Sequence, residues 1–322
     1  MARLRAIFIG NTFISSYSLG KFAPIIIQMK IVILGPGAIG SLWACCLSRA
    51  GHSVSLWSQH QCDSIYLQQE HLPAIQFTSN NKDKLASADL LLVTLKAPNV
   101  MPAIKEIALN IAQQTIVVLM HNGMGTAEAI NTLLPNNPLV IATTTHGAFR
   151  PKPSQVLHTG KGYTELGGYN DGGKRCDFLQ PVFEHALPKT SWHCDIFTPI
   201  WHKLAINCII NPLTAIDQVK NGELSSAKYQ EVITLLIDEI NQVLKAEDID
   251  VTHENLTTKV HQVIEATSDN YSSMHQDIFH KRPSEIDFIT GYLLQRAKAH
   301  NISAPVNQTL FQKIKQIEQD HD

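Results

Sequence analysis

Apolar residues along this chain follow two kinds of pattern, and the change between them lies near residue 195. In the first part, short apolar runs occur at residues 30–34, 53–57, 90–95, 116–120 and 139–143. The runs LLLVTL and IVVLM are apolar almost throughout, which is typical of strands buried on both faces of a parallel sheet. Helical patterns alternate with these runs, beginning with residues 38–50. Residues 29–195 are therefore predicted to form a Rossmann-type, doubly wound α/β domain that binds a dinucleotide.

The remainder of the chain reads mainly as helix. A glycine-containing turn at residues 159–162 predicts a hairpin between residues 156–157 and 163–166, and a short helix and a strand at residues 190–194 follow. Beyond Phe197 the apolar spacing predicts five helices. They span residues 198–210, 223–247, 252–268, 284–299 and 305–319. Residues 196–322 are therefore expected to form an all-helical substrate domain.

The N-terminal segment fits neither pattern. Arg3 and Arg5 precede a short apolar stretch at residues 6–14, which loosely resembles a signal peptide but is interrupted by a glycine and an asparagine. The segment MKIVILGPGAIG, which begins at Met29, looks like the natural start of a dinucleotide-binding domain. We expect residues 1–28 to be an extension or a misassigned start. No other stretch is long enough to predict a membrane span.

Composition narrows the class of partner. The 322 residues include 26 basic and 28 acidic side chains, a formal net charge of −2, which gives no electrostatic reason to expect nucleic acid as a partner. The six cysteines form no C-x-x-C pair and none has a histidine at zinc-finger spacing. We therefore expect free thiols in the reducing cytoplasm, and no metal site.

The glycine-rich sequence GPGAIG follows the first predicted strand and precedes the first predicted helix. Its glycines provide a tight turn, close approach of the backbone to a pyrophosphate, and close packing of helix on strand. The start of the helix adds free N–H groups and the positive end of its dipole. The expected cofactor-binding residues here are Gly35, Pro36, Gly37, Ala38, Ile39 and Gly40.

The end of the second strand bears on which nicotinamide dinucleotide is bound. An NAD site usually has a carboxylate there for the ribose hydroxyls, whereas an NADP site offers a cation to the 2′-phosphate. Here the strand ends in Trp57, Ser58, Gln59 and His60, which include neither a carboxylate nor a guanidinium. The missing carboxylate favours NADPH, and NADH is not excluded.

A polar stripe runs along the apolar segment WHKLAINCIINPLTA. Lys203, Asn207 and Asn211 recur at intervals of four and therefore share one side of a helix that is otherwise apolar. A lysine paired with a carboxylate in the core is the usual explanation of one such residue, but two asparagines in line with it favour a side that faces a ligand. A lysine ammonium there can protonate the oxygen of a ketone as hydride reaches its carbon.

Two further polar segments have both structural and functional interpretations. Asn122 lies in a turn after a buried strand, at the end of the sheet where α/β proteins bind ligands, but the same turn can be a plain connection capped by Thr126. Ser284 and Asp287 resemble a capping box, in which Glu285 merely favours the helix N-terminus. On position alone, this structural interpretation of Glu285 is preferred.

Seven motifs, in this order and spacing, change that balance. They are GPGAIG, LLLVTLKA, HNGMGT, WHKLAINCIINPLTA, NGEL, SSMHQD and SEIDF. Together they resemble the ketopantoate reductase (2-dehydropantoate 2-reductase) family over residues 29–315. The resemblance implies a Rossmann domain joined to an all-helical domain with the active site between them. It also implies NADPH-dependent reduction of ketopantoate to (R)-pantoate in pantothenate and coenzyme A biosynthesis.

The resemblance also implies roles for particular residues. Lys203 is the expected catalytic acid, and Glu285 is expected to help hold the ternary complex through the substrate hydroxyl. Lys96, Asn122 and Ala148 are implied cofactor contacts. The implied substrate contacts are Asn122, Lys203, Asn207, Asn211, Asn221 and Ser273.

Gln59 departs from the family pattern, because members often carry an arginine there for the 2′-phosphate. Lys96 is a possible substitute from across the cofactor site. Two rival functions stay open: reduction of another branched 2-keto acid, and a non-catalytic sensor of nicotinamide nucleotides. The sequence indicates no oligomeric state.

Overall fold

The computed structural model describes residues 28–60 and 62–320, so the expectation for the N-terminal extension lies, except for Gln28, outside the described residues. The strands are β1 (Lys30–Leu34), β2 (Ser53–Trp57), β3 (Ser64–Gln69), β4 (Ile75–Thr78), β5 (Leu90–Val93), β6 (Ile116–Met120), β7 (Leu139–Thr144), β8 (Gly147–Lys152), β9 (Gln155–Gly160), β10 (Thr164–Gly168) and β11 (Thr190–Trp192). The α-helices of this first part are α1 (Ala38–Arg49), α2 (Lys82–Ala86), α3 (Ala97–Ile107), α4 (Thr126–Leu133) and α5 (Leu179–Ala186).

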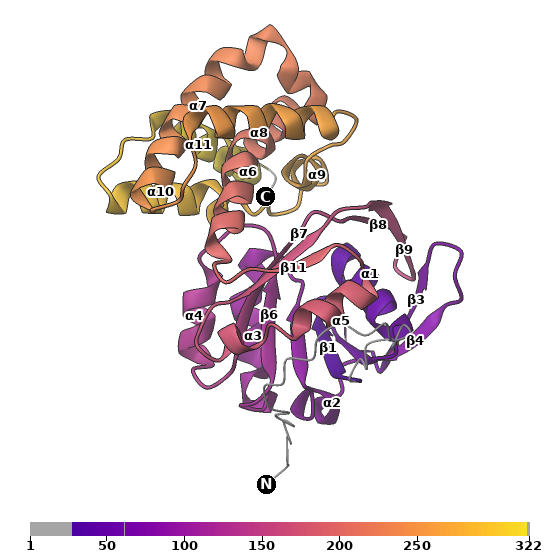
Figure 1. The fold of residues 1–322 in the computed structure, drawn as a ribbon. Coiled ribbons are helices and arrows are strands. Elements are labelled where there is room, and N and C mark those ends of the chain that lie inside the picture. The colour runs from indigo at the N-terminus through magenta and orange to yellow at the C-terminus, as the bar shows by residue number, and fades with distance from the viewer. Residues whose placement is uncertain (1–27, 61, 321–322) are drawn as a thin grey trace, which may run out of the picture.

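The main sheet has seven strands in the order β11-β10-β7-β6-β5-β1-β2 (Figure 1). The five strands from β7 to β2 are parallel, whereas β10 is antiparallel to β7 and β11 is parallel to β10. Every residue of β5 and β6 is buried, as expected for strands covered on both faces. One face packs against α1 and α5, and the other packs against α3 and α4. The predicted Rossmann-type, doubly wound sheet is confirmed.

The prediction of a hairpin between residues 156–157 and 163–166 is wrong. These segments belong to β9 and β10, which lie in different sheets. The antiparallel partner of β9 is β8, and that of β10 is β7. β8 and β9 also join β3 and β4 in a second sheet, in the order β4-β3-β9-β8. Sequence reading missed this sheet, because its strands are short and half-exposed and therefore lack a continuous apolar run.

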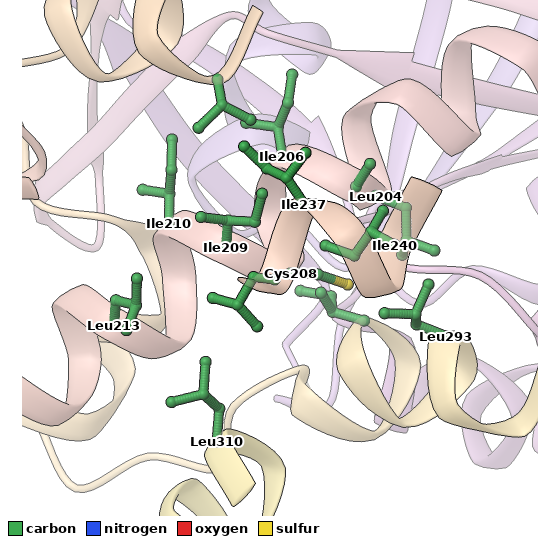
Figure 2. Close-up of a cluster of buried hydrophobic side chains, with 14 of the residues drawn as sticks. Leu204, Ile206, Cys208, Ile209, Ile210, Leu213, Ile237, Ile240, Leu293 and Leu310 are labelled. Carbon is green, nitrogen blue, oxygen red and sulfur yellow. The ribbon is translucent and has the colours of Figure 1, made fainter. Parts of the chain in front are cut away.

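The second part of the chain is helical, as predicted. Its elements are α6 (Phe197–Asp217), the short 3-10 helix η3 (Asn221–Ser225), α7 (Ala227–Ala246), α8 (His253–Ala266), α9 (Ser273–Phe279), the 3-10 helix η4 (Ile286–Phe288), α10 (Thr290–Ala299) and α11 (Pro305–Gln319). α6 is the central helix of this part, since side chains all round it are buried against α7, α10 and α11 (Figure 2). A helix that is apolar on nearly every side requires such an environment.

Two predicted helices differ from the observed ones in ways that matter for function. α6 continues to Asp217, seven residues beyond the predicted end at residue 210, and includes Pro212. The predicted helix at residues 284–299 begins instead at Thr290, after an irregular segment that contains η4. The capping-box interpretation of Ser284 and Asp287 is therefore wrong: the Ser284 hydroxyl accepts from the Ile286 amide at 3.2 Å, and Asp287 pairs with Lys315 at 3.0 Å.

The two parts meet at the carboxyl end of the parallel strands, where α6 leads from the sheet into the helical part (Figure 1). The final strand, β11, ends at Trp192 and α6 begins at Phe197, which brackets the predicted change near residue 195. Within the described residues, no helix is both long and apolar enough to cross a membrane. Ligands of open α/β sheets bind at this end of the strands, so the meeting of the two parts is the place to look for a site.

Candidate active site

The glycine-rich turn between β1 and α1 has the geometry expected of a phosphate cradle. Gly35 has φ +89°, a left-handed conformation that favours glycine. A Cβ on Gly40 would lie 2.4 Å from both the Gly35 carbonyl oxygen and the Thr94 hydroxyl, so α1 can pack this closely only with glycine there. A Cβ on Gly37 would instead meet nothing within 4 Å. The backbone at Gly37 therefore faces open space, as close approach of a pyrophosphate requires.

The first turn of α1 supports the same conclusion. The helix starts at Ala38 with no side chain capping its N-terminus and no acidic residue in its first turn. Its first backbone N–H groups and the positive end of its dipole are therefore available to an anion. The residues at 35–40 fit the diphosphate of a dinucleotide.

The loop after β2 is tied to the segment that follows β4. The Asn80 side chain accepts a hydrogen bond from the Ser58 amide at 2.9 Å and donates one to the His60 carbonyl at 2.6 Å. Gln59 lies between these two anchored residues and is exposed. The loop presents a polar amide where a dinucleotide would place its adenosine ribose, and it carries no arginine or lysine.

Lys203 lies on the second turn of α6 and reaches back to the sheet. Its ammonium donates a hydrogen bond to the Thr144 carbonyl at the end of β7, at 2.8 Å. Within the described part of the chain it forms no salt bridge, so the alternative that the sequence did not favour, a core lysine paired with a carboxylate, is not found. Burial lowers the pKa of Lys203 to about 8, although the charges of Glu285 and Glu165 partly oppose this effect. The ammonium is thus a readily available acid near neutral pH.

A cavity of about 170 Å³ lies beside Lys203, between α6 and the loop that follows β6. Asn122 and Asn207 also line it, and Tyr169, Phe197 and Tyr292 form aromatic walls. Asn211 continues the polar stripe one turn further along α6 and is 5% exposed. The structure therefore places Lys203, Asn207 and Asn122 around one small space, with Asn211 farther inside the helical part.

Glu285 joins the helical part to the sheet. One carboxylate oxygen accepts from the Ala97 amide at 3.0 Å, and the other accepts from the Asn122 side chain at 3.1 Å. Glu285 is 6% exposed, and this burial raises the pKa of its carboxyl group, although the two hydrogen bonds counteract the shift. The suggestion that Glu285 merely favours the N-terminus of its own helix is wrong, because both of its partners lie on the other part of the chain.

The loop that carries Asn122 is held on the same segment. The Met124 amide donates to the Phe288 carbonyl at 2.8 Å, and a Cβ on Gly123 would lie 2.5 Å from that oxygen. Thr126 does not cap α4, because its hydroxyl bonds to the His121 ring at 2.7 Å. The loop is a docking element between the two parts, and the interpretation as a plain capped turn is wrong.

Lys96 contacts the helical part as well. Its ammonium lies 2.6 Å from the Asp277 carboxylate and donates a hydrogen bond to the Pro283 carbonyl at 3.2 Å. The same carboxylate lies 3.3 Å from Arg282. Asp277 is buried, and this burial raises the pKa of its carboxyl group against the effect of both cations. Lys96 lies next to Ala97, so its side chain and the partner of Glu285 belong to one short segment after β5.

Three predicted residues lie farther from Lys203. Asn221, in η3, donates to the Thr267 hydroxyl at 2.9 Å, and its buried carbonyl oxygen has no partner in the described structure. Ser273 opens α9 and is exposed, whereas the neighbouring Ser272 is buried and accepts from the Thr214 hydroxyl of α6 at 2.7 Å. Ala148 lies half-buried on β8, packed on the core that includes α1. None of these three described residues lines the cavity beside Lys203.

His121 and Asp277 belong to the motifs HNGMGT and SSMHQD, but the sequence alone indicates no role for either residue. The Nδ1 atom of His121 faces the Asn122 carbonyl at 2.9 Å and must carry the proton, so Nε2 accepts from Thr126. Burial lowers the pKa of His121, and the nearby charge of Lys203 adds to this effect, which keeps the ring neutral. The motifs that contain His121 and Asp277 indicated that these segments matter, but only the fold shows what each side chain contacts.

The arrangement combines a dinucleotide cradle with a lysine acid and neutral amides at the rim of a small cavity. It holds no cluster of metal-ligating side chains within the described residues. An oxygen near Lys203 that gains negative charge would find a cation and a proton there. This is the requirement for reducing a ketone with a nicotinamide dinucleotide.

Comparison with known families agrees with this description. Residues 31–171 match the family model described as ketopantoate reductase PanE/ApbA, and residues 195–318 match the model of its C-terminal part. The two matches leave out only the segment that holds α5 and β11 and the two ends of the chain.

Individual relatives are similar over nearly their whole length. The 2-dehydropantoate 2-reductase of Vibrio cholerae is 49% identical over 291 residues, which cover 90% of this chain and 98% of the relative. The enzyme of the same name from Escherichia coli O157:H7 is 39% identical, covering 91% and 97%. Among solved structures, D-mandelate dehydrogenase with NADH and anilino(oxo)acetate superposes with a TM-score of 0.81 at 23% identity, covering 90% of this chain and 99% of that one.

Proposed function

The chain belongs to the ketopantoate reductase family, and from this premise we propose that it reduces ketopantoate (2-dehydropantoate) to (R)-pantoate with NADPH, a step of pantothenate and coenzyme A biosynthesis. The observation that carries the proposal is the position of Lys203 beside a cavity that Asn122 and Asn207 also line. Burial lowers the pKa of this lysine to about 8. Relatives at 49% and 39% identity, both named 2-dehydropantoate 2-reductase, support the choice of substrate.

Lys203 is the proposed proton donor. A nicotinamide held by the residues above would supply a hydride for C2 of the keto acid. The ammonium of Lys203 would give a proton to the C2 oxygen as that oxygen gains negative charge. The lysine side chain would then be a neutral amine. The Thr144 carbonyl, at 2.8 Å, fixes the position of the ammonium without neutralising its charge.

Neutral amides and one carboxylate are proposed to hold the rest of the substrate. Asn207 and Asn211 extend from Lys203 along α6, and Asn221 and Ser273 provide further hydrogen-bonding groups in the helical part. Amides can bind the substrate carboxylate and hydroxyl without competing charge. Glu285 is proposed to accept a hydrogen bond from the substrate hydroxyl, because its carboxylate already lies beside Asn122 at 3.1 Å.

The cofactor is proposed to bind from the glycine-rich turn towards β8. Residues 35–40 would hold its diphosphate, Lys96 and Asn122 would contact it at the ends of β5 and β6, and Ala148 would lie near the nicotinamide half. The preference for NADPH rests on the end of β2, where Ser58, Gln59 and His60 include no carboxylate to repel a 2′-phosphate. We also propose a cytoplasmic location, because all six cysteines are free.

The test is the loss of nicotinamide absorbance when purified protein meets ketopantoate, run in parallel with NADPH and NADH. Rapid oxidation of NADPH is the expected result. Turnover with NADH alone would retain the reaction and overturn the cofactor preference. Specificity constants for ketopantoate, ketoisovalerate and ketopantolactone would separate this function from reduction of another branched 2-keto acid. Binding of a dinucleotide without any turnover would favour a nucleotide sensor.

A further inference from the structure

Arg150, on β8, makes contacts that the proposed function does not yet use. Its guanidinium donates through Nη1 to the Pro36 carbonyl and through Nη2 to the Pro153 carbonyl. Its Nε–H is buried and has no hydrogen-bond partner in the described structure. Arg150 therefore connects the β8–β9 hairpin to the second residue of the glycine-rich turn.

The positive charge of Arg150 is not balanced by any carboxylate in the described part of the chain. Both of its partners are neutral carbonyl groups, and it takes part in no salt bridge there. Burial alone lowers the pKa of the guanidinium, with no opposing effect from a nearby acid. Partial burial of a cation without a counter-charge is costly, and an anion placed beside it would recover part of that cost.

The position of Arg150 identifies the anion. Its partner Pro36 lies between Gly35 and Gly37. The backbone at Gly37 faces open space, and the uncapped start of α1 follows directly. Ala148 and Arg150 both belong to β8, two residues apart, and the pairing of β8 with β9 shifts register between Phe149 and Lys152. The strand therefore leads from the expected nicotinamide contact to the diphosphate cradle. Gln59, at the expected 2′-phosphate position, belongs instead to the loop after β2.

We propose that Arg150 is a cofactor-binding residue that pairs with the diphosphate of the nicotinamide dinucleotide, acting from β8 opposite the glycine-rich turn. This inference rests on the dinucleotide binding proposed above. Because NADPH and NADH share the diphosphate, Arg150 raises the affinity for both equally and does not discriminate between them.

The test is calorimetric titration of Arg150→Met and of the unsubstituted protein with NADPH, NADH, ADP-ribose and adenosine 2′-phosphate. A charge-assisted hydrogen bond contributes enough that its loss should raise the Kd of the first three ligands by about tenfold to a hundredfold. The Kd of adenosine 2′-phosphate, which lacks a diphosphate, should stay the same. Lys152→Met is the matched control, since Lys152 is exposed on the same strand and loses the same charge.

Two results would overturn the inference. An increase in Kd for NADPH but not for NADH would assign Arg150 to the 2′-phosphate. Unchanged Kd values for all the dinucleotides would show that Arg150 has only a structural role, connecting β8 to the glycine-rich turn. If the unsubstituted protein bound neither dinucleotide, the proposed function itself would fail, and this inference with it.

A second variant covers the case in which Arg150→Met does not fold. Arg150→Lys keeps the charge but cannot make both carbonyl hydrogen bonds, so it should retain NADPH and NADH affinity within about threefold if charge is what matters. Thermal unfolding without ligand would show how much stability each variant loses. The proposal would be contradicted if Arg150→Lys folds but its Kd for NADPH and NADH rises about tenfold or more, as expected for loss of the charge.

Discussion

The two halves of the candidate site are built in different ways. The glycine-rich turn is made of six consecutive residues, and it offers a ligand backbone N–H groups and the open space beside Gly37. The catalytic side is made of single side chains that come from distant parts of the chain: Glu285 reaches Ala97 and Asn122, and Lys203 reaches Thr144. The first half is a local structure, whereas the second exists only when the two parts of the molecule are packed together.

This difference predicts how each half responds to substitution. A backbone site is damaged by adding atoms, because its function depends on close approach. A side-chain site is damaged by removing the group that supplies charge or a proton.

Removing the acid should have the greatest effect on turnover. Lys203→Ala should lower kcat by roughly 10²–10⁴-fold, the usual scale for loss of a general acid. Calorimetric titration should find NADPH affinity unchanged, because the cradle is separate. Single-turnover and steady-state absorbance assays would measure the loss. Near-normal kcat in this variant would refute the assignment of Lys203.

Removing the carboxylate of Glu285 should mainly weaken the binding of the substrate. Glu285→Ala should raise the KM for ketopantoate by about tenfold to a hundredfold, since charge-assisted hydrogen bonds to the carboxylate are lost. Glu285→Gln is the matched control, because it keeps the shape and loses the charge. A change confined to cofactor affinity would contradict the proposed role and place Glu285 in the cradle half.

The pH dependence should come from the catalytic half alone. The active form of Lys203 is protonated, so kcat/KM for reduction should be flat below the pKa of about 8 and fall about tenfold per pH unit above it. The folded pKa lies below that of the unfolded chain, so Lys203 also destabilises the folded protein below about pH 8, and this penalty disappears as the pH rises further. A rate profile with no break between pH 7 and 9 would contradict the assignment. NADPH affinity, measured over the same range, should not follow this break.

Two glycine variants test the cradle half. Gly40→Ala should destabilise the ligand-free protein by about 1–3 kcal/mol, because its Cβ would lie 2.4 Å from the Gly35 carbonyl and the Thr94 hydroxyl. Gly37→Ala meets no atom within 4 Å, so it should leave the Tm unchanged and raise the Kd for NADPH by roughly tenfold. Thermal unfolding and calorimetric titration measure the two effects. Equal Tm losses in both variants would show that the space at Gly37 is not kept for a ligand.

The smallest expected effect concerns cofactor preference. Gln59→Arg should increase the preference for NADPH over NADH by a few-fold to tenfold, because a guanidinium near the ribose can pair with the 2′-phosphate. Parallel kcat/KM measurements with the two cofactors would show this. An unchanged ratio would mean that this position does not set the preference.

The contrast between the halves also explains what the sequence could predict. The Rossmann-type sheet, the glycine-rich turn and the buried helix with Lys203 were predictable, because each is encoded by consecutive residues with a clear period. The second sheet was not, since its short strands are half-exposed and two of them pair with partners far away in the chain.

The catalytic half shows the limit most clearly. On position alone, Glu285 was better explained as a residue at a helix start, and only the resemblance to the family suggested a role in the site. Its actual partners lie 188 and 163 residues away, and no local pattern carries that information. Asp277 and Arg150 are further examples, because their contacts depend on which segment packs against them.

The hydrogen bond between Asn122 and Glu285 has a thermodynamic consequence. Asn122 is the proposed cofactor contact and Glu285 the proposed substrate contact, and the two side chains are only 3.1 Å apart. A ligand that reorients one of them changes the free energy with which the other meets its own ligand. By linkage, the factor by which NADPH changes the affinity for ketopantoate must equal the factor by which ketopantoate changes the affinity for NADPH. A substitution at this pair that changes the coupling factor would therefore change it equally for both ligands, whatever it does to each separate affinity.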